Sequence, residues 1–179
     1  MNHYKSWSGL QKQLLNFLCE PLKNRISYFL TRYHTVHNAY GRAVILLDKK
    51  ELVSFSWVEM QEQEENLSSL LRLYRKTKEE NKKFPYENYQ EAVKNLQSKW
   101  NENCIYCESD FLLAVTDFLQ MPMIKALHSD NAIIRILAIL DRRVGTRTLK
   151  KIKQEDTYKN LPEWVRQFYE LRFSVSNGI

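Results

Sequence analysis

Apolar residues recur at helical spacing in the first segment of the chain, and the pattern then changes to one typical of strands. Within residues 8–20 the apolar positions lie on one side of a helix: Leu10, Leu14, Phe17 and Leu18. Pro21 cannot continue that hydrogen-bond ladder and ends the helix. The segments that follow are rich in β-branched and aromatic residues: 25–35, 42–48 and 51–57. They predict an antiparallel meander of three strands.

The last two predicted strands are joined by Lys49 and Lys50, which we expect to form a two-residue turn. In the register set by that turn, one face of the hairpin carries Val44, Leu46, Val53, Phe55 and Trp57. The other face carries Ala43, Ile45, Leu47 and Leu52 beside Ser54 and Ser56. Both faces are largely apolar, so we expect each of them to be covered by another element.

From Ser56 onward the helical period returns and continues to the end of the chain. A long helix is predicted from Ser56 to about Lys82, and later helices are predicted to begin near Asn88, Ser109, Pro122, Ser129 or Asp130, Thr146 or Thr148, and Pro162. Residues 132–140 are apolar almost all round, which indicates a helix through the core. The predicted fold is α+β in a single domain, 1–179, with a helix and β-meander in 1–57 and a helical part in 58–179.

Composition narrows the class of protein. Apolar residues make up 44% and charged residues 27%, with only 4 Gly and 4 Pro, which excludes a disordered chain and a loop-rich disulfide scaffold. The 3 cysteines, without an export signal or an apolar stretch long enough to span a bilayer, predict a soluble cytoplasmic protein with no membrane contact. We expect no cofactor and no metal.

Most of the net charge of +6 lies in residues 1–84, at +5, but one stretch near the C-terminus is strongly basic within an otherwise acidic second half. Residues 85–179 contain 13 cations and 12 acids, yet residues 142–153 contain no acid and six cations: Arg142, Arg143, Arg147, Lys150, Lys151 and Lys153. A local excess of this kind is a candidate binding surface for an acidic protein or a nucleic acid. These six residues are therefore the candidate binding residues.

The same stretch also has a structural interpretation, which we favour. Arg142 and Arg143 are predicted to lie in the last turn of the buried helix, where cations interact well with the helix dipole. Gly145 is predicted to take the left-handed cap position. Asp141 is expected to be at least partly buried and paired with an arginine, either Arg42 or Arg147.

Candidates for catalysis are few. Arg32, Tyr33 and His34 are the residue types that metal-independent ribonucleases use for proton transfer and phosphate stabilisation. Cys104 and Cys107 form half of a zinc motif and His34 with His37 could supply the other half, but a lone pair of cysteines with a distant pair of histidines is a weak signal. Cysteines at a helix end are more often buried structural residues.

Several short motifs together resemble those of a family of small uncharacterised bacterial proteins. The matching residues are Trp7, Ser8 and Leu10; Arg25, Tyr28, Thr31 and Tyr33; Gly41, Arg42 and Ile45; and the L-D-R-R-x-G-x-R-T-L signature at residues 140–149. The family pattern has a glycine after Asp48, where this chain has Lys49. The resemblance covers residues 7–153 and implies no activity and no catalytic residues.

The sequence favours a non-catalytic binding or interaction protein with a local basic surface. One alternative is a metal-independent ribonuclease or toxin-like enzyme that uses Arg32, Tyr33 and His34. A second alternative is an immunity-type or phage-related protein that binds another protein.

Overall fold

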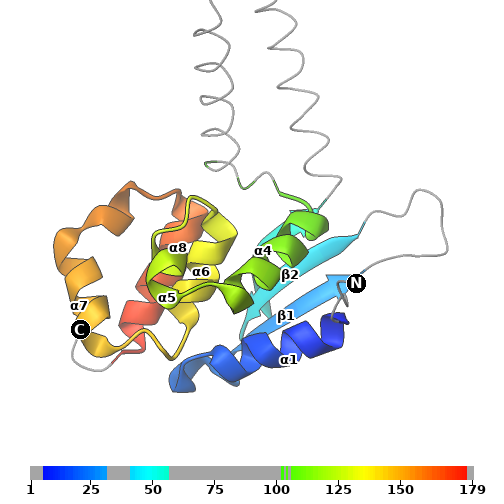
Figure 1. Ribbon diagram of the computed structural model, residues 1–179, viewed down its shortest axis with the longest axis horizontal. Coiled ribbons are helices and arrows are strands. Elements are labelled where there is room, and N and C mark those ends of the chain that lie inside the picture. Colours follow the sequence, from blue (N-terminus) through cyan, green and yellow to red (C-terminus); the bar gives the residue numbers. More distant parts are fainter. Residues whose placement is uncertain (1–5, 32–40, 57–101, 103, 105, 177–179) are drawn as a thin grey trace, which may run out of the picture.

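The computed structural model describes residues 6–31, 41–56, 102, 104 and 106–176. Within these residues a helix and a three-stranded antiparallel sheet precede a helical second half, so the predicted α+β fold is confirmed (Figure 1). The first helix, α1 (Trp7–Phe17), is followed by a short 3-10 helix, η1 (Glu20–Leu22), that contains Pro21. The helix predicted from Ser56 to Lys82 and the one predicted at Asn88 lie outside the described residues.

The sheet has the strand order β1 (Ile26–Thr31), β2 (Arg42–Leu47) and β3 (Lys50–Ser56). Its last turn differs from the prediction, because the turn residues are Asp48 and Lys49, with φ angles of 50° and 68°, and Lys50 already belongs to β3. Two consecutive positive φ angles give the primed turn whose twist matches that of the flanking strands. Arg25 holds Asp48 in this turn: its Nη2 lies 2.7 Å from Asp48 Oδ2, and its carbonyl accepts the Asp48 amide at 2.8 Å.

An irregularity in the ladder between Ile45 and Leu46 changes which side chains share a face. Ala43 lies opposite Phe55 and Ile45 opposite Val53, with an irregularity in the ladder directly after Ile45. The predicted register, which placed Val53 and Phe55 with Val44, is therefore wrong by one position. Because side chains alternate between faces along a strand, this single step brings four buried residues onto one face: Ala43, Ile45, Val53 and Phe55.

The opposite face of the sheet is only partly covered. Val44 is buried, but Phe29, its neighbour on β1, is 51% exposed. Arg42 and Glu51 form an ion pair of 2.6 Å on this face, and Val44 lies between their positions along the strands. Phe29 lies on β1, outside the hairpin for which two covered faces are expected, and its large aromatic ring meets solvent.

The helical half contains α4 (Glu108–Gln120), α5 (Met123–Leu127), α6 (Ala132–Leu140), α7 (Thr146–Glu155), the 3-10 helix η2 (Thr157–Asn160) and α8 (Glu163–Ser174). The helix predicted through the core is α6, in which every residue except Arg135 is buried. Its N-cap is Asn131, whose side chain accepts hydrogen bonds from the amides of Ile133 and Ile134, and not Ser129 or Asp130. Pro162 stands directly before α8, as predicted.

The core joins the sheet to the helices through aromatic side chains. Phe55 of β3 stacks on Phe111 of α4 with ring centroids 5.3 Å apart, and Trp7 of α1 meets the edge of the same ring at 5.9 Å. Rings in these arrangements gain attraction beyond the area that they bury. In Figure 1, α1 and the sheet lie on one side of α4, and α5 to α8 gather on the other, with α7 at the outer edge of the molecule.

Candidate functional site

The basic stretch begins where α6 ends, and a long-range contact sets that end. Leu18, directly after α1, forms an isolated β-bridge with Asp141. The amide of Cys19 donates to the carbonyl of Leu140 at 3.0 Å, and the amide of Arg142 donates to the carbonyl of Phe17 at 2.7 Å. These bonds satisfy backbone groups that the two helix ends leave open. Arg142 therefore lies beyond α6 and not in its last turn, so the predicted contact with the helix dipole is wrong.

Asp141 is buried and paired with an arginine, as the sequence predicts. The partner is Arg143, however, and neither Arg42 nor Arg147: Arg143 Nη2 lies 2.7 Å from Asp141 Oδ2, and its Nε donates to both carboxylate oxygens at 3.0 and 3.1 Å. The Asp141 side chain has no exposed area, and its Oδ1 also accepts the backbone amide of Arg143 at 2.7 Å. A short local loop brings these groups together at a lower entropic cost than a distant arginine requires.

Arg143 is therefore part of the structural junction. Its guanidinium also lies over the ring of Phe17, with 4.1 Å from Cζ to the ring centroid, and it ties the loop after α6 to the end of α1. Arg143, like Asp141, lies just after Leu140, the last residue of the helix predicted through the core. Arg42, the third predicted structural residue, pairs instead with Glu51 in the sheet.

Gly145 has a different role from the predicted one. Its φ of −76° and ψ of 164° are extended, and it is the N-cap of α7, so the prediction of a left-handed helix cap is wrong. The chain does not need a left-handed residue here because α6 has already ended at the bridge with Leu18. A Cβ atom added at Gly145 would meet no atom within 4 Å, so the start of α7 is open to solvent.

The cations of α7 gather on its outer side. Leu149 is buried and Ile152 is half-buried, and both turn towards the core as predicted. At 3.6 residues per turn, Arg147, Lys150 and Lys151 fall on the opposite side of the helix, and all three are exposed. Because the cations lie opposite the apolar stripe of α7, the packing of that stripe against the core keeps the cations on the outer side of the helix.

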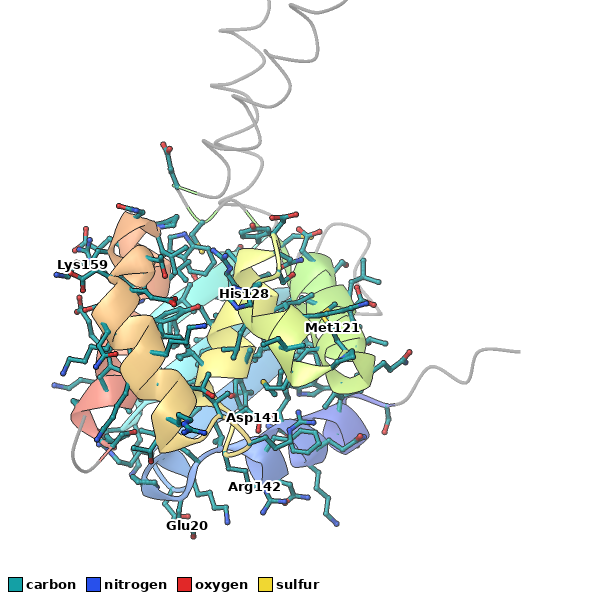
Figure 2. The ribbon with its side chains drawn as sticks, turned by 60° about the vertical axis from the view of Figure 1, so that its left-hand side comes forward. Glu20, Met121, His128, Asp141, Arg142 and Lys159 are labelled. Carbon is teal, nitrogen blue, oxygen red and sulfur yellow. The ribbon has the colours of Figure 1, made fainter. Side chains whose placement is uncertain are left out.

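Two further cations flank this group. Lys153 is exposed on the α8 side, where its Nζ lies 5.8 Å from the ring centroid of Phe173, and Arg142 is exposed before α7 (Figure 2). Lys151 lies 3.6 Å from Glu155, a long and exposed ion pair that contributes little. We define the α7 basic surface as the five exposed cations of this region that are not bound to Asp141: Arg142, Arg147, Lys150, Lys151 and Lys153.

Behind this surface lies a group of buried polar side chains. Arg172 of α8 donates from Nη2 to the carbonyl of Val144 at 3.1 Å and so fixes the loop between α6 and α7. Burial raises the pKa of the Cys19 thiol, and burial together with the charge of Asp141 raises the pKa of Tyr28. Both groups therefore stay protonated at neutral pH. They serve packing and are poor nucleophiles or bases.

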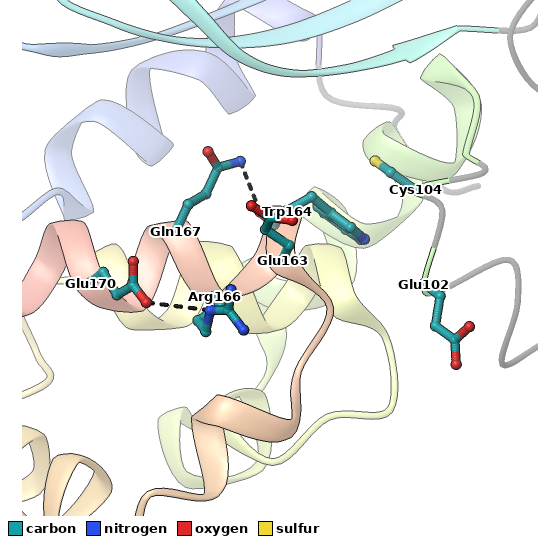
Figure 3. Close-up of a pocket in the computed structure, with 7 residues that line it drawn as sticks. All are labelled: Glu102, Cys104, Glu163, Trp164, Arg166, Gln167 and Glu170. Carbon is teal, nitrogen blue, oxygen red and sulfur yellow. Dashed lines mark hydrogen bonds and ion pairs between the residues drawn. The ribbon is translucent and has the colours of Figure 1, made fainter.

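A second feature is a pocket of about 440 Å³ beside the first turns of α8 (Figure 3). It is lined by Glu102, Cys104, Glu163, Trp164, Arg166, Gln167 and Glu170. Gln167 donates from Nε2 to the carbonyls of Leu52 and Trp164 at 3.2 and 3.0 Å, and Arg166 pairs with Glu170 at 3.3 Å. Carboxylates outnumber cations in this lining, so the pocket does not extend the α7 basic surface. Sequence reasoning missed it because its walls come from segments about sixty residues apart.

The remaining candidates receive no support as a site. Arg32, Tyr33, His34 and His37 lie outside the described residues. Cys104 contacts the carbonyl of Ser54 through Sγ at 4.0 Å, whereas Cys107 is the buried N-cap of α4. In the described part of the chain, no three His, Cys, Asp or Glu side chains come together as metal ligands, and no helix is long and apolar enough to cross a membrane.

The order of elements and the exposed cations of α7 define an α+β protein with a basic helix at its edge. The chain belongs to the SF0329 protein family, whose family model matches residues 6–173. No curated protein and no solved structure matches it. The matched segment contains residues 7–153, over which the motifs noted above extend, and the match assigns no reaction and no ligand.

Proposed function

We propose that this protein is a non-catalytic binding protein that holds an acidic macromolecule on the α7 basic surface. The observation that carries the proposal is the exposure of five cations in one region; among the residues that the structure describes, only Lys151 of these five pairs with a carboxylate, that of Glu155. Concentrated charge of one sign raises the local concentration of an oppositely charged partner and speeds association.

The way in which α7 is anchored supports a binding role. Asp141 and Arg143 fix the loop before the helix, Arg172 holds the carbonyl of Val144, and Leu149 inserts into the core. The cations are therefore mounted on a helix whose position is set before a partner arrives. A preorganised surface loses less entropy on binding than one that must first become ordered.

The proposal is tested with matched charge variants. The first variant combines Arg147→Gln, Lys150→Gln and Lys151→Gln, and the control combines Lys12→Gln, Lys49→Gln and Lys125→Gln, which are exposed cations elsewhere on the chain. Both lose the same net charge. Fluorescence anisotropy with labelled poly-L-glutamate and with a labelled DNA duplex measures binding, and thermal unfolding checks that each variant folds.

We expect the α7 variant to bind at least one of these polyanions about tenfold or more weakly than the unmodified protein, with the control changed by less than about threefold. Equal losses in both variants would show that only total charge matters and would refute a dedicated surface. If neither probe binds at low salt, the proposed binding role of the α7 basic surface is also refuted.

The alternatives from the sequence rest on other residues. A metal-independent ribonuclease depends on Arg32, Tyr33 and His34, outside the described residues, and RNA cleavage in chelator by the unmodified protein but not by His34→Ala is its test. An immunity-type or phage-related role requires another protein as the partner, and the poly-L-glutamate probe addresses the case of an acidic one. A cytoplasmic location and a bacterial origin stay predictions.

A further inference from the structure

We infer that the acidic macromolecule is duplex DNA, with α7 lying along its major groove. This inference rests on the proposed function and names the partner of the same surface. In it, Lys150 and Lys151 contact phosphates on opposite walls of the groove, and Arg147 and Gln154 face the base edges between them.

The chemistry of the surface favours a nucleic acid over an acidic protein. Interfaces between proteins have an apolar centre rich in aromatic residues and are depleted of lysine. Here Val144 and Leu149 are each only 1% exposed and Ile152 is half-buried, and the large exposed apolar side chains of the described chain lie on β1, α4 and α5. Interfaces with DNA are more polar and much more positively charged, which matches the α7 basic surface.

The aromatic residues around α7 argue against a single strand as the ligand. Proteins that hold single strands stack the bases on exposed aromatic rings. Tyr158, on the η2 turn that contacts α7, and Phe173, whose ring lies 5.8 Å from Lys153 Nζ, are 9% and 7% exposed and pack edge to face with centroids 5.1 Å apart. Both rings are buried in the core. Among the described residues, the α7 basic surface therefore has exposed cations but no exposed ring on which a base can stack.

The distribution of side chains around α7 fits a groove. Successive residues of a helix are about 100° apart, so Lys150 and Lys151 diverge by that angle, and Arg147 and Gln154 fall between them. All four side chains are exposed. A helix seated in the groove therefore directs one lysine to each wall while the two middle residues face its floor.

The size of the helix agrees with the B-form groove. The ten residues of α7 are about 15 Å long, and the major groove of B-DNA, about 12 Å wide, admits an α-helix. The major groove of duplex RNA is deep and narrow, and side chains cannot read it. Arg and Gln, the types between the lysines, are also residues that pair with base edges in the major groove.

The inference is tested by anisotropy with four labelled probes: a 20-bp DNA duplex, the RNA duplex of the same sequence, one of its DNA strands alone, and poly-L-glutamate. Salt is varied from low to physiological concentration. The DNA duplex is expected to bind at least about fivefold more tightly than the other three. Its logarithmic salt slope is expected to lie between about −1.8 and −3.6 because two to four phosphates are neutralised.

Two variants separate the assigned roles. Lys150→Gln combined with Lys151→Gln removes two phosphate contacts and is expected to reduce the slope by about 1.8. Gln154→Ala removes a residue that faces the bases and is expected to leave the slope unchanged. An unchanged slope in the double-lysine variant overturns the assignment of the groove walls.

The outcomes also distinguish this inference from the proposed function. If poly-L-glutamate, RNA or the single strand binds as tightly as the DNA duplex or more tightly, and still depends on the α7 basic surface, the inference is wrong and the proposed function stands. If no probe binds, both are wrong.

Discussion

Arg143 reaches back two residues to hold the buried carboxylate of Asp141, with its Nη2 2.7 Å from Oδ2 and its Nε within 3.1 Å of both oxygens. The carboxylate has no exposed area, whereas the arginine is 40% exposed. The pair thus combines a fully desolvated anion with a cation that water still reaches. It closes the loop between α6 and α7, on which the position of the α7 basic surface depends.

Removal of Arg143 is expected to destabilise the protein more than removal of its neighbour. Arg143→Ala leaves the Asp141 carboxylate buried without its cation, which costs about 2–4 kcal/mol of unfolding free energy. Arg142→Ala changes an exposed side chain with no carboxylate bound to it in the described region, and its effect is expected to stay within about 0.5 kcal/mol. Urea denaturation measures both. Equal effects of the two substitutions would contradict a structural role for the Asp141 pair.

Of the three glycines in the described part of the chain, Gly41 has the least room for a side chain. A Cβ atom there would lie 2.7 and 2.8 Å from Cγ and Cδ of Glu108 and 2.8 Å from the carbonyl oxygen of Thr31. Gly41→Ala is therefore expected to lower the unfolding free energy by about 1–3 kcal/mol. Gly145→Ala serves as the matched control, because its Cβ meets no atom within 4 Å, and it is expected to change stability by less than about 0.5 kcal/mol.

A double variant identifies which neighbour causes the strain. Glu108→Ala removes two of the three close contacts and leaves the backbone oxygen of Thr31. Gly41→Ala is thus expected to cost less in the Glu108→Ala background than in the unmodified protein, but still to cost something. Strict additivity of the two substitutions would show that Glu108 is not the obstacle.

The elements that local sequence predicts well are those whose residues need no distant partner. The apolar stripe of α1, the run through α6 and the inward position of Leu149 all follow from helical spacing. The burial of Asp141 follows from its place at the end of an apolar helix.

Long-range contacts explain the features that the sequence did not reveal. The bridge between Leu18 and Asp141 ends α6 before Arg142, and residues 123 positions apart give no local signal of such a contact. The sequence identifies six cations as the candidate surface. Only the folded structure shows that one of them, Arg143, is bound to the carboxylate of Asp141. The pocket beside α8 was missed for the same reason, since Glu102 and Glu163 meet only in the folded chain.

Stability is expected to fall at alkaline pH. Burial raises the pKa of Tyr28 and of Cys19 and raises the pKa of Tyr106 to about 12. The folded chain then keeps protons that the unfolded chain releases near pH 9 for cysteine and pH 10 for tyrosine, so this stabilisation is complete below those values and is lost as pH rises. Each such tyrosine contributes a loss of about 1.4 kcal/mol for each pH unit above 10.

Urea titrations at pH 7, 9.5 and 10.5 measure this decline, and Tyr28→Phe is the informative variant. Phenylalanine keeps the ring but cannot ionise, so the variant is expected to lose less stability between pH 9.5 and 10.5 than the unmodified protein. Identical losses would show that Tyr28 does not take part in the alkaline transition.

The turn between β2 and β3 offers a substitution that is expected to stabilise the protein. Lys49 has a φ of 68°, a conformation that costs a side-chain-bearing residue about 1–2 kcal/mol and glycine almost nothing. Part of this gain is offset because glycine also makes the unfolded chain more flexible. Lys49→Gly is therefore expected to raise the unfolding free energy by about 0.5–1 kcal/mol, while the contacts of Asp48 with Arg25 remain in place.

Lys50→Gly is the matched control for this prediction, because it removes the same side chain one residue later. Lys50 lies in β3 opposite Leu47, where glycine weakens a strand. Thermal unfolding is expected to shift upward for Lys49→Gly and downward for Lys50→Gly. Had the turn consisted of Lys49 and Lys50, both substitutions would stabilise, so shifts of opposite sign distinguish the observed register from the one that alternation of apolar residues alone predicts.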